Sequence, residues 1–186
     1  MRILAIETSC DETALSIIES TENTSPVSFT VLANQVLSQI DMHKEYGGVF
    51  PAVAKREHAK ALVPLLKTTL TEAKLLNLRT PIAMPESFIS LFPQEPELLE
   101  ALPEVLTWQK PAVDAIAVTS GPGLEPALWV GINFAKALST LWNLPLYPIN
   151  HMEGHIYSSV LEKHSEGYTV PSLSFPALAL LISGGH

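Results

Sequence analysis

Two histidines four residues apart, His151 and His155, have the type and spacing to do chemistry. On an α-helix they share one face, with about 5–6 Å between their Cβ atoms. Neutral imidazoles at this spacing can bind one metal ion together, and histidine is the commonest metal ligand. The alternative is a pair of helix histidines with no ligand role, and the motif by itself leaves both interpretations open.

Glu153 lies two residues from each histidine. A helix turns residues at this separation roughly to its opposite side. In the zinc-protease pattern H-E-x-x-H, the glutamate directly follows the first histidine and acts as general base. The different spacing here argues against a metallopeptidase.

A second candidate site is the polar connection Thr-Ser-Cys-Asp-Glu-Thr at residues 8–13, which joins two apolar runs. Hydroxyl and backbone N–H groups at such a tip can bind phosphate oxygens, while Asp11 and Glu12 can hold a cation or its waters. Turns are commonly built from these residue types, so an ordinary hairpin turn is the alternative.

The sequence pattern predicts that a mixture of strands and helices positions these residues. Apolar runs at 2–7, 14–19 and 29–35 predict three antiparallel strands in a meander. A helix is expected from about Ala52, and Pro64 should kink it or end its regular hydrogen bonding.

The second half of the chain repeats this mixture. The pattern predicts the following elements: strands at 113–119, 144–149 and 175–182, and a helix at 127–142 with Pro126 in its first turn and Gly131 allowing a close packing contact. Six prolines interrupt residues 77–111, which we interpret as an insertion with one or two short helices folded over the surface. A strand at 175–182 followed by Gly184 and Gly185 would be half of a hairpin, so we expect this chain to be the N-terminal part of a longer protein.

Composition limits the function classes. The net charge of −8 and the pI of about 5.2 exclude nucleic-acid binding by the overall field, so RNA contact would need a local basic patch or a partner subunit. Four basic residues begin the predicted helix and offer such a patch, although a solvated helix face is the ordinary interpretation: Lys55, Arg56, His58 and Lys60. Apolar runs are too short for a membrane span, and the single Cys10 fits a reducing cytoplasm.

Six motifs now match one family in order: Ile6-Glu7-Thr8-Ser9-Cys10-Asp11-Glu12-Thr13, His43-Lys44-Glu45-Tyr46-Gly47-Gly48-Val49, Arg56-Glu57-His58, Ser120-Gly121-Pro122-Gly123-Leu124, His151-Met152-Glu153-Gly154-His155 and Leu181-Ile182-Ser183-Gly184-Gly185-His186. The sequence resembles the TsaD family of bacterial tRNA threonylcarbamoyladenosine transferases, also called the glycoprotease or O-sialoglycoprotein endopeptidase family. The likeness covers the chain except about 77–111.

The resemblance implies an α/β fold of the actin-like ATPase (ribonuclease H-like) class, with a mixed five-stranded sheet flanked by helices in each of two lobes. Residues 1–149 would form most of the first lobe. Residues 150–186 would supply the metal-binding helix and the start of the second lobe.

The resemblance also implies the chemistry. The family transfers threonylcarbamoyl from threonylcarbamoyl-AMP to N6 of adenosine 37 in tRNAs that read codons beginning with A. By similarity, His151 and His155 bind one divalent metal ion, Fe²⁺ or zinc, and the family's third ligand, an aspartate, lies beyond residue 186. Substrate or an ATP-type nucleotide would contact this set: Ser9, Ile182, Ser183, Gly184, Gly185 and His186. Asp11 and Glu12 are the catalytic candidates at the nucleotide end of the cleft.

Partners implied by the family are tRNA and subunits resembling TsaB and TsaE, with no membrane. A competing interpretation is a non-catalytic actin-like subunit of the same complex. Chains of the TsaB type lack the paired histidines, so His151 and His155 argue against it.

Overall fold

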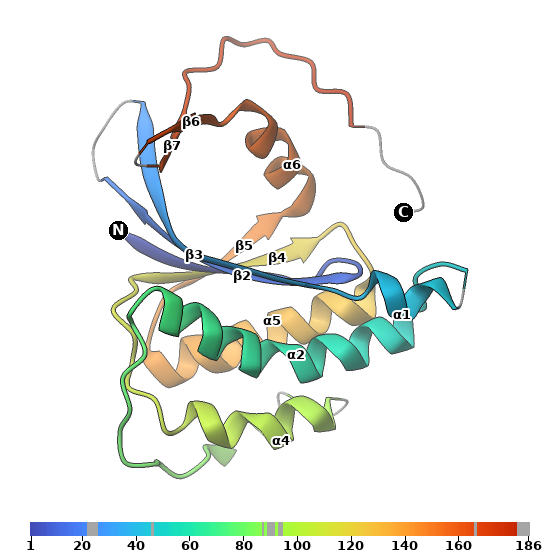
Figure 1. Cartoon of the computed structure of the whole chain (residues 1–186), viewed down its shortest axis with the longest axis vertical. Coiled ribbons are helices and arrows are strands. Elements are labelled where there is room, and N and C mark those ends of the chain that lie inside the picture. Colours follow the sequence, from blue (N-terminus) through green and yellow to red (C-terminus); the bar gives the residue numbers. More distant parts are fainter. Residues whose placement is uncertain are drawn as a thin grey trace.

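A mixed β-sheet organises the molecule. The computed structural model describes residues 1–21, 26–45, 47–86, 88, 92, 95–165 and 167–181. Its strands, in chain order, are β1 Arg2–Glu7, β2 Glu12–Ser20, β3 Val27–Ser38, β4 Ala115–Gly121, β5 Leu146–Asn150, β6 Glu162–His164 and β7 Gly167–Val170. In space the order is β5-β4-β1-β2-β3-β7-β6 (Figure 1).

Strand directions confirm the predicted meander. β2 runs antiparallel to both β1 and β3, whereas β4 is parallel to β1 and β5 is parallel to β4. This order with one reversed strand is the five-stranded core of the actin-like, ribonuclease H-like class. The short hairpin of β6 and β7 pairs with β3 and extends the sheet from five strands to seven.

Helices lie on both sides of the sheet. The helices are α1 Ile40–Lys44, α2 Pro51–Glu72, α4 Pro96–Val105, α5 Glu125–Trp142 and α6 His151–Val160. Figure 1 shows α2 and α5 side by side on one face, with α4 outside α2 and α6 on the other side of the sheet. None of the helices in the described ranges is long and apolar enough to span a membrane.

The core lies between the sheet and α2 and α5. Every second residue of β1 and β2 points into it, as the alternation of a strand requires, so Leu4, Ile6, Leu15 and Ile17 are buried. From α5, Phe134 enters the same cluster without exposure. Burial of this apolar surface fixes the sheet against the helices.

Pro64 lies inside α2, which continues to Glu72, so the helix does not end there; buried side chains on both sides of Pro64 hold it on the sheet. A kink at Pro64 stays a prediction. The segment 77–111 includes the expected short helix α4, but it is more than a surface cover. Phe88, Leu98 and Trp108 from it are buried in the main core.

The predicted strand at 175–182 is wrong for its described part. Residues 175–181 have no regular structure, and Phe175, Leu178 and Leu180 are 78%, 98% and 82% exposed. Figure 1 shows this segment leaving the sheet as an extended trace. Among the described strands none pairs with it, so nothing buries its apolar side chains.

Gly131 confirms the close approach expected inside α5. A Cβ atom at this position would lie 2.3 Å from Thr8 Oγ1. Thr8 is fully buried and donates a hydrogen bond from Oγ1 to the carbonyl oxygen of Ala127 at 2.9 Å. The end of β1 therefore packs directly on the backbone of α5.

We expect Gly131→Ala to lower the free energy of unfolding by about 1–2 kcal/mol, because overpacking outweighs the gain in helix propensity. Urea denaturation measures the change. Gly154→Ala in α6 is the matched control, since its Cβ meets nothing within 4 Å and the substitution should stabilise by up to about 1 kcal/mol. Equal stabilisation by both substitutions would contradict the packing argument.

Candidate functional site

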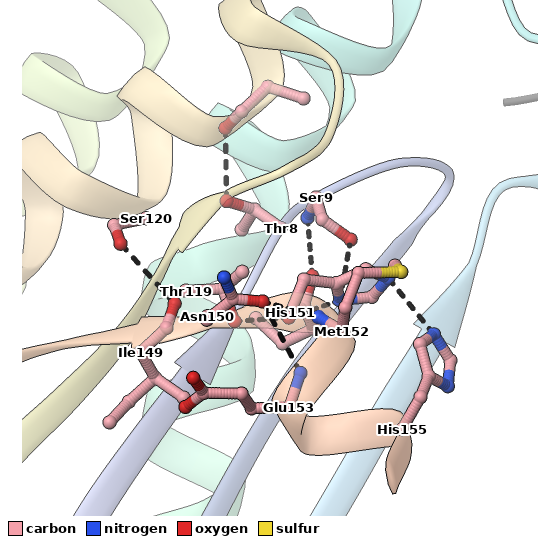
Figure 2. Close-up of polar contacts among 12 residues, drawn as sticks. Thr8, Ser9, Thr119, Ser120, Ile149, Asn150, His151, Met152, Glu153 and His155 are labelled. Atoms are coloured by element: carbon pink, nitrogen blue, oxygen red, sulfur yellow. Dashed lines mark hydrogen bonds and ion pairs between the residues drawn. The ribbon is translucent and has the colours of Figure 1, made fainter. Parts of the chain in front are cut away.

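The site forms where parallel strands end. Because β1, β4 and β5 are parallel, their carboxyl ends meet at one edge of the sheet, where open α/β sheets bind ligands. Glu7 is the last residue of β1, Thr119 lies near the end of β4, and His151 directly follows β5. Figure 2 shows Thr119 and His151 close together at the strand ends, beside Ser9.

Asn150 fixes the start of α6. Its side-chain oxygen accepts hydrogen bonds from the backbone N–H groups of Met152 at 2.8 Å and Glu153 at 3.3 Å, as an N-cap does. The first helical turn therefore begins at His151, and His155 follows one turn later on the same face.

The two imidazole rings face each other through their Nε2 atoms. These atoms lie 3.1 Å apart, and the ring planes make an angle of 78°. Two imidazole nitrogens on one tetrahedral zinc ion, each about 2.0–2.1 Å from it, would be about 3.3 Å apart. The two Nε2 atoms are thus spaced to occupy two coordination positions of one metal ion. The part of the chain described by the structure holds no third His, Cys, Asp or Glu grouped with them.

Glu7 is a site residue that the sequence analysis missed. Its Oε2 lies 3.4 Å from His151 Nδ1 and accepts a hydrogen bond from the Thr119 hydroxyl, while its Oε1 accepts one from the Ser9 N–H at 2.5 Å. An acidic residue at the end of a central strand was the available signal. The pairing of β1 with β4 and of β4 with β5 brings it beside the histidine.

Ser9, predicted as a substrate contact, lies at this same site. It is buried, with Oγ 3.4 Å from His151 Nδ1. Its carbonyl oxygen accepts a hydrogen bond from the Leu124 N–H at 2.7 Å. A Cβ atom at Gly123 would lie 2.6 Å from that oxygen, so the glycine loop before α5 approaches Ser9 as only glycine permits.

Asp11 and Glu12 lie next along the turn. Glu12 is exposed and starts β2, two residues earlier than the strand predicted from residue 14, and Asp11 is partly buried. Among the described residues, neither carboxylate hydrogen-bonds the histidine pair. Burial, with the nearby Asp11 carboxylate, raises the pKa of the Cys10 thiol to about 11, so Cys10 is a neutral thiol at pH 7.

Behind this turn lies a buried series of hydrogen bonds. The Phe50 N–H donates to His43 Nδ1 (3.4 Å), His43 Nε2 donates to the Gln39 side-chain oxygen (3.2 Å), the Gln39 amide donates to His58 Nδ1 (3.2 Å), and His58 Nε2 donates to the Cys10 carbonyl oxygen (3.1 Å). A backbone N–H only donates and a carbonyl only accepts, so the two ends fix the direction. Both histidines are therefore neutral, each with its proton on Nε2.

The buried network corrects the interpretation of the predicted basic cluster. His58 is fully buried, so it belongs to no solvated or RNA-facing surface. The remaining members have acidic partners: Lys55 pairs with Glu95 at 3.3 Å, and Arg56 and Lys60 both pair with Glu57 at 3.0 Å. The net positive charge of this face is smaller than the sequence suggests. The predicted substrate contacts at 182–186 lie outside the described residues.

The topology and the site at the strand ends together define a protein of the actin-like ATPase class. The model of the family TsaD, described as tRNA N6-adenosine threonylcarbamoyltransferase, matches residues 30–78 and 95–186. The chain therefore belongs to the TsaD family. The match leaves out residues 1–29 and 79–94, and the second of these stretches falls inside the segment predicted as an insertion.

Relatives agree with this membership. A tRNA N6-adenosine threonylcarbamoyltransferase from Thermomicrobium roseum is 39% identical over 186 residues, and the match covers all of this chain but 40% of the relative. Two solved structures share 17% and 14% identity: YeaZ from Pseudomonas aeruginosa (TM-score 0.42; 81% of this chain, 43% of that one) and an uncharacterized protein similar to peptidase YEAZ from the same organism (TM-score 0.46; 95% and 70%). Both TM-scores lie below 0.5, so these likenesses are loose.

The buried network makes stability depend on pH. Burial lowers the pKa of His58 below its ordinary value of 6.5, because a charged imidazole loses its hydration there. Above pH 6.5 both the folded and the unfolded chain hold neutral His58, and its contribution is complete. As pH falls from 6.5 towards the lower folded pKa, only the unfolded chain takes the proton, so stability is lost in that window.

We expect His58→Gln to lower the free energy of unfolding at pH 7.5 by about 1–3 kcal/mol, because buried partners lose their hydrogen bonds. The difference from the unsubstituted protein should shrink as pH falls below 6.5. Urea denaturation at pH 7.5, 6.5 and 5.5 measures both curves. Parallel curves over this range would show that His58 titrates alike in both states.

Proposed function

We propose that the protein of which this chain is part transfers threonylcarbamoyl from threonylcarbamoyl-AMP to N6 of adenosine 37 in tRNAs that read codons beginning with A. Membership of the TsaD family supports the proposal, and the observation that carries it is the pair of converging Nε2 atoms of His151 and His155, 3.1 Å apart. The chain spans about 40% of the length of the curated relative.

In this proposal His151 and His155 supply two ligands to one divalent metal ion, Fe²⁺ in the first instance and zinc as the alternative. Such an ion supplies Lewis acidity that polarises the carbonyl and phosphate oxygens of the acyl-adenylate. Neutral imidazole is the form that binds metal.

The reaction requires attack by N6 of adenosine on the carbamoyl carbon. A C–N bond forms, the C–O bond to phosphate breaks, AMP leaves with the bonding electrons, and N6 loses one proton. Asp11 and Glu12 are the proposed catalytic residues, at the nucleotide end of the cleft. Ser9 and residues 182–186, the latter through backbone N–H groups, are the proposed substrate contacts.

Two other functions compete. A metallopeptidase would need a glutamate beside metal-bound water, but Glu153 is exposed, and Figure 2 shows its carboxylate on the other side of α6 from the His155 ring. A non-catalytic actin-like subunit would have no use for two converging imidazoles. The proposed partners are tRNA and subunits resembling TsaB and TsaE, in the cytoplasm.

Replacing both His151 and His155 with alanine in the whole protein should remove the bound metal and abolish transfer. Elemental analysis by mass spectrometry measures the metal, and nucleoside mass spectrometry of tRNA measures the product. His164→Ala is the matched control, because His164 is an exposed histidine on β6, outside the site. Unchanged metal content in the folded double variant would overturn the metal assignment.

The face of α2 that carries Arg56 and Lys60 is the proposed tRNA phosphate contact. Arg56→Glu with Lys60→Glu should weaken tRNA binding and lower the slope of log affinity against log salt by about 0.7–0.9 for each phosphate that is no longer neutralised. Filter binding at several salt concentrations measures this slope. Lys67→Glu, an exposed charge reversal further along α2, is the control. An equal effect of both changes would place the tRNA elsewhere.

A further inference from the structure

We propose that Glu7 is a positioning residue: it holds His151 in the tautomer whose proton is on Nδ1 and so keeps the Nε2 lone pair directed at the proposed metal. The inference rests on the proposed metal site for its functional meaning. Its structural content, the tautomer of one imidazole, is independent of any metal.

The Glu7 carboxylate is itself held in place. Its Oε1 accepts the backbone N–H of Ser9 at 2.5 Å, and its Oε2 accepts the hydroxyl of Thr119. Thr119 is 7% exposed on β4, and Glu7 ends the adjacent parallel strand. Both donors belong to the sheet or to the turn packed on it, so the carboxylate has a fixed orientation.

This orientation decides the proton position on His151. A carboxylate has no hydrogen to donate, so the ring must supply one from Nδ1 to bond Oε2 at 3.4 Å. The Ser9 hydroxyl, also 3.4 Å from Nδ1, can donate or accept a hydrogen bond and therefore does not determine which ring nitrogen carries the proton. With its proton on Nδ1, His151 keeps Nε2 free as an acceptor, and Nε2 is the atom that faces His155.

Metal-binding histidines are commonly oriented in this way by a carboxylate on their second nitrogen, and loss of that partner typically weakens metal affinity by about 10–100-fold. Glu7 approaches Nδ1, on the side of the ring away from the Nε2 pair. That placement makes it a partner of the ligand. Glu153, two residues from each histidine, is exposed, and among the described residues its carboxylate forms no hydrogen bond or ion pair with either ring.

Glu7→Gln gives a sharp test. The Ser9 N–H can only donate, so the glutamine oxygen must turn to Ser9 and its NH₂ group must face Thr119 and His151. His151 Nδ1 then has to accept, which moves the ring proton to Nε2. We expect long-range ¹H–¹⁵N spectra of the metal-free whole protein, labelled in histidine, to show Nδ1–H at His151 before the substitution and Nε2–H after it.

Cobalt(II) titration followed by visible absorption gives the second measurement. Glu7→Gln should weaken Co²⁺ binding by about 10–100-fold with an unchanged band shape. Glu153→Gln removes the same charge from the same helix as the histidine pair and should change neither the tautomer nor the affinity. Circular dichroism and the urea midpoint show that each variant is folded.

Three results would overturn the proposal: Nε2–H at His151 in the unsubstituted protein, an unchanged tautomer in Glu7→Gln, or unchanged Co²⁺ affinity in that variant. A changed band shape would make Glu7 a direct ligand and would also overturn it. If the unsubstituted protein binds no Co²⁺, the proposed metal function fails, whereas the spectra of the metal-free protein still decide the role of Glu7.

Discussion

The parallel pairing of β1 with β4 and of β4 with β5 is the constraint on which the site depends. It places the ends of three strands at one edge of the sheet, so Glu7, Thr119 and His151 meet although more than a hundred residues separate Glu7 from the other two. No local element could hold this group. The helices α2 and α5 contribute indirectly, because burial of their apolar faces against the sheet keeps the strands in register.

Close backbone packing is the second requirement. Thr8 lies against Gly131 of α5, and Ser9 lies against Gly123 in the loop before it. In both places a Cβ atom would overlap its neighbour, so the turn after β1 has one position relative to α5. That position sets the Ser9 N–H and hydroxyl, which contact Glu7 and His151. Thus the packing of this turn on α5 and on the loop before it positions the two Ser9 groups that contact Glu7 and His151.

Periodicity in the sequence predicted most of the fold, because alternation and helical spacing are local properties that burial in the core requires: the meander and α5 both agree. Misses arose where tertiary pairing decides. Glu7 has no local signature of its contact with His151. The basic residues 55, 56, 58 and 60 are close in sequence, yet at 3.6 residues per turn they spread around α2, and His58 faces the core. The apolar segment 175–181 could form a strand only with a partner strand.

The turn of Cys10, Asp11 and Glu12 is held from both sides, which bears on how its carboxylates could act. On one side the Ser9 carbonyl oxygen accepts a hydrogen bond from the Leu124 N–H in the loop before α5. On the other, the Cys10 carbonyl accepts His58 and the Asp11 carbonyl accepts the Gln39 N–H at 2.8 Å. A buried polar group without a hydrogen-bond partner destabilises the fold. In this network each side chain has its partners, because the hydrogen bonds all run in one direction from the Phe50 N–H to the Cys10 carbonyl. The backbone of the turn is therefore preorganised, so Asp11 and Glu12 can present charge at a fixed place without bonding the histidine pair.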